Sequence, residues 1–193
     1  MATPSPTISS RPATPGFRVT RLDAETMHGA LDDLAEILHA CVADGAAVSF
    51  VLPFGLDDAR AFWRDDVFPQ VESGATRLFV AVDDEEVRLL GTVQLGIDMP
   101  PNQPHRADLK KLLVHPRARR RGIARAMIEQ LEIEAASLGR SLITLDTRTG
   151  DVAEHLYRSM DYAVSGVIPD FSLDVEGTRL DATTVLYKRL KLK

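Results

Sequence analysis

A cluster of arginines next to a glycine has the clearest chemistry in this sequence. Gly122 opens a stretch with helical spacing of apolar residues, so a helix is expected to begin there. The backbone amides of a first helical turn lack partners within the helix, and Gly122 and Ala124 let an anion approach them closely. Five arginines add positive charge within nine residues, with no acidic residue among them: Arg117, Arg119, Arg120, Arg121 and Arg125. This combination predicts a phosphate-binding turn, and the alternative is an exposed basic helix start without a ligand.

The rest of the chain is acidic. Its 193 residues include 23 Lys and Arg against 28 Asp and Glu, for a net charge of −5. Without the five clustered arginines, 18 basic residues face 28 acidic ones, which leaves −10. This balance argues against a general nucleic-acid binder, although the cluster alone could contact RNA or DNA phosphates. We therefore expect no nucleic-acid partner and one local site for a polyanion.

Several other classes of protein are excluded by composition. The longest uncharged apolar stretch, Gly45–Leu56, has 12 residues and contains Pro53, so no membrane span is expected. Cys41 is the only cysteine, which excludes an intrachain disulfide and a cysteine zinc site and fits a reducing cytoplasm. The five histidines show no HxH or HExxH spacing, so no metal site is expected. Residues 1–16 lack the features of a signal peptide and are predicted to form a disordered tail, followed by a single domain over 17–193.

The elements that must position the arginine turn alternate between strands and helices. Apolar and β-branched runs predict strands over residues 17–22, 76–82, 87–97, 106–114, 141–147, 162–168 and 181–189. Apolar spacings of three and four predict helices over residues 24–43, 57–73, 122–138 and 151–160, with Asp57 or Asp58 capping the second. The order β-α-α-β-β-β-α-β-α-β-β indicates an α/β fold with a mixed sheet.

The arginine turn resembles the acetyl-CoA pyrophosphate loop of the GNAT (GCN5-related) N-acetyltransferases. The motif is Arg119–x–x–Gly122–x–Ala124, preceded by Leu113–Val114–His115–Pro116, and it lacks the Lys–Ser/Thr pair of a nucleotide P-loop. The resemblance implies the GNAT fold, with a mixed, mostly antiparallel sheet flanked by helices and acetyl-CoA as cosubstrate. It also implies a cofactor-binding set that comprises the backbone of Leu112, Leu113 and Val114 and the turn residues Arg119, Arg120, Arg121, Gly122, Ile123, Ala124 and Arg125.

One branch of this superfamily, the tabtoxin-resistance acetyltransferases, is similar to the chain over residues 18 to 190. The matching segments are Ala46–Phe50, Asn102, Arg106–Asp108, Lys111–Val114, Asp146–Thr147, Gly150–Glu154, Gly166–Pro169 and Thr184–Lys188. The resemblance implies a small amino-acid-like or antimetabolite acceptor and a role in antibiotic or toxin resistance. Ala124 stands where the family has a second glycine. Gly150 replaces an asparagine that often contacts the cofactor, so that contact is not expected here.

Direct acetyl transfer from a thioester to a primary amine requires a group that takes a proton from the amine and a group that protonates the leaving thiolate. The resemblance places the proton-donating tyrosine of the family at Tyr157, whose alternative role is packing in the core. Asp146 ends a short apolar strand, and the branch resemblance suggests it as base or substrate anchor. The alternative for Asp146 is to cap the helix that begins near Asp151.

Asp108 is the second candidate base. It lies on the strand that leads to the arginine turn, where several members of the superfamily carry a glutamate base. Aspartate is one methylene shorter than glutamate, so a water relay is expected in place of direct contact. The alternative is an ion pair with Arg106 or Lys110.

The sequence says less about the residues that bind the acceptor. The segment from Val48 to Phe54 is expected to border the acceptor pocket, through Val48, Ser49, Phe50 and Phe54, whereas Trp63 is expected in the core. Two alternatives stay open: acetylation of a protein or peptide amine, and a non-catalytic acetyl-CoA sensor. A closed pocket under this segment would argue against a protein acceptor. The sequence leaves the oligomeric state open, a homodimer included.

Overall fold

Seven strands form one mixed sheet in the order β1-β2-β3-β4-β5-β7-β6. The computed structural model describes residues 16–192, so the predicted tail lies, except for Gly16, outside the described residues. The strands are β1 (Phe17–Leu22), β2 (Thr76–Asp83), β3 (Leu89–Gly96), β4 (Arg106–Val114), β5 (Leu142–Arg148), β6 (Ala163–Leu173) and β7 (Leu180–Arg189). The β4–β5 pair is parallel and the other neighbouring strands are antiparallel, which confirms the predicted fold class.

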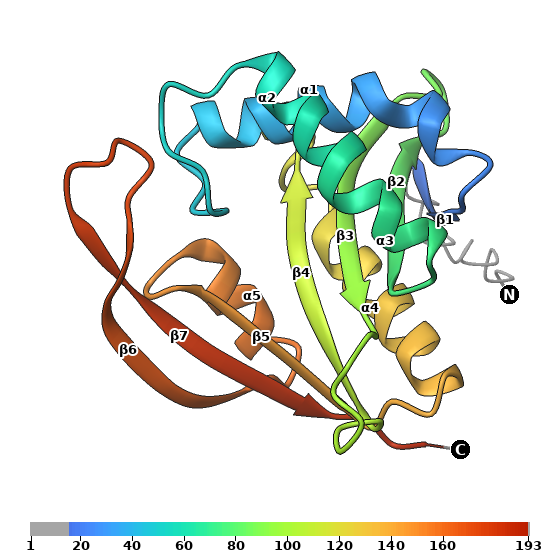
Figure 1. Cartoon of the computed structure of the whole chain (residues 1–193), viewed down its shortest axis with the longest axis vertical. Coiled ribbons are helices and arrows are strands. Elements are labelled where there is room, and N and C mark those ends of the chain that lie inside the picture. The colour runs from blue at the N-terminus through green and yellow to red at the C-terminus, as the bar shows by residue number, and fades with distance from the viewer. Residues whose placement is uncertain (1–15, 193) are drawn as a thin grey trace, which may run out of the picture.

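Helices cover both faces of the sheet (Figure 1). They are α1 (Leu31–Ala43), α2 (Leu56–Ala61), α3 (Phe68–Glu72), α4 (Ile123–Ser137) and α5 (Val152–Arg158), with a π-helical turn over Phe62–Val67. One core cluster lies under α4 and α5, and a second lies under α1 to α3. Trp63 is fully buried in the second cluster and donates its indole N–H to the Leu34 carbonyl at 2.9 Å, as expected of a core residue. Within residues 16–192, no helix is both long and apolar enough to cross a membrane.

Three boundaries differ from the sequence-based expectation. The first helix begins with a 3₁₀ turn at Met27–Ala30, and α1 starts only at Leu31. Gly55 is the N-cap of α2, and Asp58 accepts the Gly55 N–H at 2.8 Å from within the first turn, so the predicted N-cap role of Asp57 or Asp58 is wrong. Strand β6 continues past Pro169 to Leu173, because an edge strand tolerates a proline that cannot donate a hydrogen bond.

The sheet opens between β4 and β5, and this opening positions the candidate site. The two strands pair only over Arg106–Asp108 and Leu142–Thr144, and they diverge beyond these residues (Figure 1). Strand β4 also contains a bulge, since its register with β3 shifts between Thr92 and Gln94. Lys111 lies at the bulge with φ of +50°. Such a bulge redirects the side chains that follow it.

Candidate active site

The turn between β4 and α4 forms one side of the site. Gly122 is the N-cap of α4 with φ of +81°, a conformation that glycine adopts without strain, and no side chain caps the helix. The first helical hydrogen bond along this turn runs from the Ala126 N–H to the Gly122 carbonyl. The amides of Ile123, Ala124 and Arg125 therefore remain available to an anion. This geometry suits the pyrophosphate that the sequence predicts here.

Carboxylates from distant parts of the chain hold three of the five arginines. Asp44 follows α1 and Asp83 ends β2, so neither is near the arginines in sequence. The ion pairs join Arg119 to Asp44, Arg121 to Asp83 at 3.2 Å and Arg117 to Glu36 at 3.9 Å. Within residues 16–192, Arg120 and Arg125 make no ion pair, and Arg125 donates to the Ser159 hydroxyl at 2.7 Å. The cluster is thus partly neutralised, and its net positive charge is smaller than the sequence alone indicates.

Strand β4 supplies the backbone of the second predicted cofactor segment. Leu113 pairs with Thr92 and Val114 with Gly91 on β3, while no residue of β4 beyond Asp108 pairs with β5 in the described part of the chain. The backbone of Leu112–Val114 therefore borders the opening between the two strands. Gly91 is required here, because a Cβ at this position would lie 2.7 Å from the Leu113 carbonyl oxygen.

Asp146 and Tyr157 lie on the β5 side of the opening. Asp146 is exposed, and the Thr183 hydroxyl lies 3.0 Å from its Oδ2 as a hydrogen-bond donor. The Tyr157 side chain is 4% exposed and packs edge-on against Tyr162, with 5.5 Å between the ring centroids. Burial and the negative charge of Asp146 raise the pKa of the Tyr157 phenol above its ordinary value. The phenol is therefore protonated at neutral pH, as a proton donor must be.

Asp108 lies where β4 and β5 meet. Its Oδ1 accepts hydrogen bonds from the Arg106 guanidinium, at 2.5 Å, and from the Thr144 hydroxyl. The ion pair with Arg106 is thus present, whereas Lys110 is not bound to this carboxylate. Because Asp108 is ion-paired with Arg106 and only partly exposed, whereas Asp146 is exposed, Asp108 is less available to an incoming amine than Asp146.

Lys111 is a site residue that the sequence reasoning missed as a functional group. Its Nζ donates to the Val48 carbonyl at 2.6 Å and to Ser49 Oγ at 3.1 Å. The same atom lies 5.1 Å from the ring centroid of Phe50 and 5.6 Å from that of Phe62. Burial lowers the pKa of Lys111 to about 8, while the nearby charge of Asp146 acts in the opposite direction. The adjacent Lys110 is exposed. The signal in the sequence is the alternation of a strand, which places neighbouring residues such as Lys110 and Lys111 on opposite faces.

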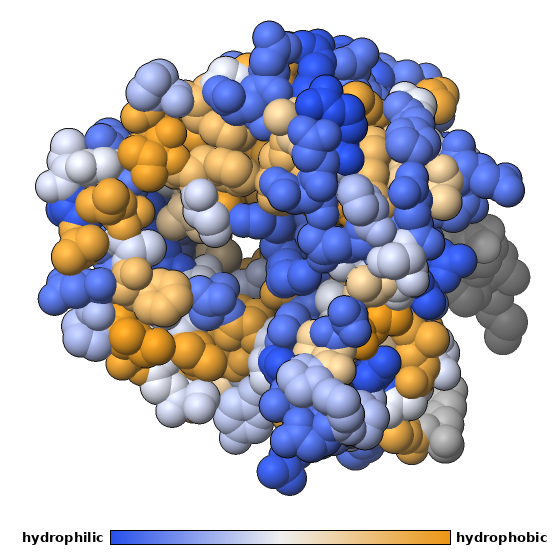
Figure 2. All heavy atoms as spheres, viewed as in Figure 1, coloured by the Kyte–Doolittle hydropathy of each residue, from blue (hydrophilic) through white to orange (hydrophobic). Residues whose placement is uncertain are grey.

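The loop between α1 and α2, residues 44–55, covers the other side of the opening. Phe50 packs against Phe54 with ring centroids 4.5 Å apart, and both are partly buried beside the α1–α3 core. The Leu52 N–H donates to the Val175 carbonyl at 2.8 Å, which joins the loop to the turn between β6 and β7. The loop and the turn thus meet across the opening, and Figure 2 shows the molecule hollowed at this place.

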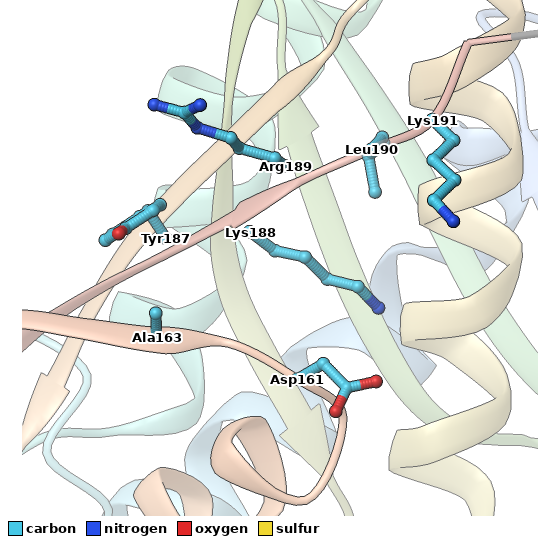
Figure 3. A pocket seen from close by; sticks show the side chains of 7 residues that line it. All are labelled: Asp161, Ala163, Tyr187, Lys188, Arg189, Leu190 and Lys191. Atoms are coloured by element: carbon cyan, nitrogen blue, oxygen red, sulfur yellow. The ribbon is translucent and has the colours of Figure 1, made fainter.

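A second depression lies at the end of β7, away from the 44–55 loop (Figure 3). It is lined by Asp161, Ala163, Tyr187, Lys188, Arg189, Leu190 and Lys191. Lys188 points toward α4, where its Nζ pairs with Glu132 at 2.7 Å. None of the site residues predicted from the sequence lines this depression, so the opening between β4 and β5 remains the candidate site.

Known proteins share both the sequence family and the fold of this chain. Residues 39–162 match the family model of the acetyltransferase (GNAT) family. The fold is similar to that of the GCN5-related N-acetyltransferase from Kribbella flavida, at 21% identity and a TM-score of 0.71, covering 91% of this chain and 98% of that chain.

Two further structures share the fold. YncA from Salmonella typhimurium, determined with its cofactor acetyl-CoA, is 17% identical at a TM-score of 0.71, covering 92% of this chain and 96% of that one. The ribosomal-protein-alanine N-acetyltransferase from Brucella melitensis is 19% identical at a TM-score of 0.71, covering 90% and 99%. Identities this low show that the folds are similar. They do not show that the proteins share an acceptor.

Proposed function

Because the chain belongs to the GNAT acetyltransferase family, we propose that it transfers the acetyl group of acetyl-CoA to the primary amine of a small molecule. The amine attacks the thioester directly while both substrates are bound. The acceptor is amino-acid-like or an antimetabolite, as the resemblance to the tabtoxin-resistance branch suggests, and acetylation would then serve resistance to an antibiotic or toxin. We place the enzyme in the cytoplasm, where its single free cysteine, Cys41, stays reduced.

The proposed cosubstrate site combines the α4 N-terminus with the open edge of β4. The free amides of Ile123, Ala124 and Arg125 bind the pyrophosphate, and Arg119, Arg120, Arg121 and Arg125 add charge around it. The backbone of Leu112–Val114 binds the pantetheine arm and donates to the thioester oxygen. Acetyl-CoA supplies an activated acetyl group and a thiolate leaving group when bound. The positive φ of Gly122 and the absence of a side-chain cap on α4 support this assignment.

The proposed acid and base lie on the β5 side. Asp146 takes the proton from the acceptor ammonium, or anchors that ammonium for a water that takes it. The amine nitrogen then bonds to the acetyl carbon, and the carbon–sulfur bond breaks. Tyr157 donates its phenolic proton to the departing sulfur, and the nitrogen of the new amide releases its remaining extra proton, which restores the phenol. The phenol is protonated at neutral pH, and the effect of the Asp146 charge on its pKa supports this role by placing the two side chains near each other. Asp108 would act only through a water, since Arg106 and Thr144 already bind it.

The hydrogen bond between Leu52 and Val175 is the observation that favours a small acceptor. Together with the near contact of Gly177 and Val51, it joins the 44–55 loop to the β6–β7 turn across the acceptor side. A bounded opening admits a small amine more readily than the surface of a folded protein. The apolar wall of Val48, Phe50 and Phe54 and the carboxylate of Asp146 would then contact the body and the ammonium of the acceptor.

Two other functions fit parts of the molecule. The Brucella melitensis relative is by name a protein acetyltransferase with the same fold, so the fold alone does not choose between acceptors. A chain terminus that enters end-on would also pass the opening. A non-catalytic acetyl-CoA sensor would use the α4 turn in the same way and would lack turnover.

The experiment has two stages. Titration calorimetry with acetyl-CoA tests the cosubstrate site, and absence of binding at millimolar concentration contradicts the proposal. Release of the coenzyme A thiol is then measured with a panel of free amines and with peptides that carry the same amines at their N-termini. Faster turnover of the free amines supports the small-molecule acceptor, faster turnover of the peptides supports the protein acceptor, and binding without turnover supports the sensor.

A further inference from the structure

We propose that Lys111 is a positioning residue that fastens the 44–55 loop to strand β4 and so fixes the acceptor wall opposite the cosubstrate. The proposal rests on the proposed function, because it assigns the acceptor side of the same site. Lys111 neither donates nor accepts the transferred proton in the mechanism above, so it is a separate residue with a separate role.

Both hydrogen bonds of the Lys111 ammonium go to the 44–55 loop. Its Nζ donates to the Val48 carbonyl at 2.6 Å and to Ser49 Oγ at 3.1 Å. The ring of Phe50, from the same loop, lies 5.1 Å away, within the range of a cation–π interaction. One ammonium therefore binds three consecutive residues of the loop by three different contacts.

Because of the position of Lys111 on β4, its contacts link the loop to the proposed cosubstrate site. Lys111 lies at the β4 bulge and directly precedes the Leu112–Val114 backbone that we assign to the pantetheine arm. A shift of the loop relative to Lys111 would change the distance between the acceptor wall and the thioester. A small misplacement of reacting groups slows a reaction strongly. The contacts of Lys111 would therefore affect turnover by setting the distance between the acceptor wall and the thioester.

The start of the loop is held by other contacts, since Asp44 pairs with Arg119 after β4 and the Gly45 carbonyl accepts from Arg148 of β5 at 3.3 Å. Ser49 has φ of +74°, a strained conformation for a residue other than glycine, and its hydroxyl is one of the two acceptors of Lys111. The Leu52–Val175 hydrogen bond fixes the loop further along, to the β6–β7 turn and not to β4. Lys111 thus joins residues 48–50, which form the acceptor wall, to strand β4.

A partly buried lysine at this position destabilises the folded protein, and this cost in stability argues for a specific role. Burial of the ammonium lowers its pKa, so the charged form is destabilised by its surroundings. A leucine or methionine would avoid this cost and still pack against Phe50 and Phe62. The hydrogen bonds to the loop backbone and to Ser49 are what such a residue would lose.

Hydrogen exchange of the full-length protein tests the proposal without knowledge of the acceptor. We expect the amides of residues 46–52 to exchange about tenfold faster in Lys111→Met than in the wild type, because the loop opens more often. Lys111→Arg keeps the positive charge and the donors and is expected to retain slow exchange. Lys110→Met removes the exposed neighbouring lysine and serves as the matched control, with exchange unchanged.

Two results would overturn the proposal. One is wild-type exchange of residues 46–52 in Lys111→Met, and the other is equally fast exchange in Lys111→Arg and Lys111→Met. Binding of acetyl-CoA, measured by calorimetry on the same variants, is expected to stay within about twofold of the wild type, because the α4 turn is untouched. Failure of acetyl-CoA to bind the wild type would count against the proposed function and leave the exchange result to be judged separately.

Discussion

The Leu52 N–H donates to the Val175 carbonyl at 2.8 Å and thereby joins the α1–α2 loop to the β6–β7 turn. The turn itself is rigid, because the Asp174 carboxylate accepts the Thr178 N–H at 2.8 Å and pairs with Arg179. The hydrogen bond thus connects the α1–α2 loop and the β6–β7 turn across the place where β4 and β5 diverge. In the proposed function, it would limit the size of an acceptor that can reach Asp146 and Tyr157.

The size limit itself can be tested by loosening this connection. We expect Gly177→Val to disturb it, since a Cβ at Gly177 would lie 3.0 Å from a methyl carbon of Val51 and Gly177 has φ of +70°. Turnover of bulky amines should rise relative to that of small amines in competition assays. An unchanged preference, with the variant folded by circular dichroism, would contradict the idea that the loop and turn exclude large acceptors.

Tyr157→Phe removes the proposed acid and keeps the ring. We expect kcat to fall by about 100-fold or more, since general acids typically contribute this much, while the Kd for acetyl-CoA stays unchanged. Steady-state kinetics and calorimetry measure the two quantities. Tyr162→Phe is the matched control, because Tyr162 packs against Tyr157 but has no assigned role in proton transfer. A kcat equal to that of the wild type would remove Tyr157 as the acid.

Substitution of Asp146 or Asp108 by asparagine distinguishes between the two candidate bases. Asp146→Asn is expected to lower kcat/KM by about 100-fold, because the amide can neither take a proton nor attract an ammonium. Asp108→Asn is expected to affect stability more than rate, because Asp108 binds Arg106 and Thr144 at the junction of β4 and β5. The opposite pattern, with the larger loss of rate in Asp108→Asn, would reassign the base.

The pH dependence of stability reports the burial of Lys111. Its pKa is lowered to about 8 from 10.5, so between these values the unfolded chain binds the proton more tightly than the folded one. The free energy of unfolding of the wild type, relative to that of Lys111→Met, should therefore rise from pH 8 to about pH 10.5 and stay constant below pH 8. Urea denaturation of both proteins across this range measures the difference. A difference that falls with pH would contradict the burial of the charge.

Arg120 tests how the arginine cluster contributes to cosubstrate binding. Like Arg125, it has no carboxylate partner within residues 16–192, whereas carboxylates partly neutralise Arg119 and Arg121. Arg120→Gln should weaken acetyl-CoA binding by up to about tenfold and reduce its dependence on salt. Arg60→Gln, which removes a charge on α2, is the control. A salt-independent Kd in the wild type would contradict an electrostatic role for the cluster.

The order of the elements could be predicted from the sequence because it depends on local patterns. Apolar spacing and turn residues such as Gly122 and Gly139 mark the helices and strands without reference to distant contacts. The family resemblance implies Asp146 and Tyr157 as a pair, and the charge of Asp146 lies near enough to raise the pKa of the Tyr157 phenol.

The remaining features depend on contacts between distant parts of the chain. The pairing of Arg119 with Asp44, and the hydrogen bond between Leu52 and Val175, join residues that no local pattern relates. The bulge that directs Lys111 toward the loop arises from the register of β4 against β3, which is set by the packing of both strands. A pattern of alternating residues predicts a regular strand, so Lys111 was not recognised as part of the site.

Amine-dependent release of the coenzyme A thiol from acetyl-CoA tests the central claim most directly. We expect release by the wild type with at least one small primary amine, at a rate that rises with the amine concentration and falls sharply in Tyr157→Phe. Binding of acetyl-CoA without any amine-dependent thiol release, across free amines and peptides, would contradict it and leave a sensor as the function.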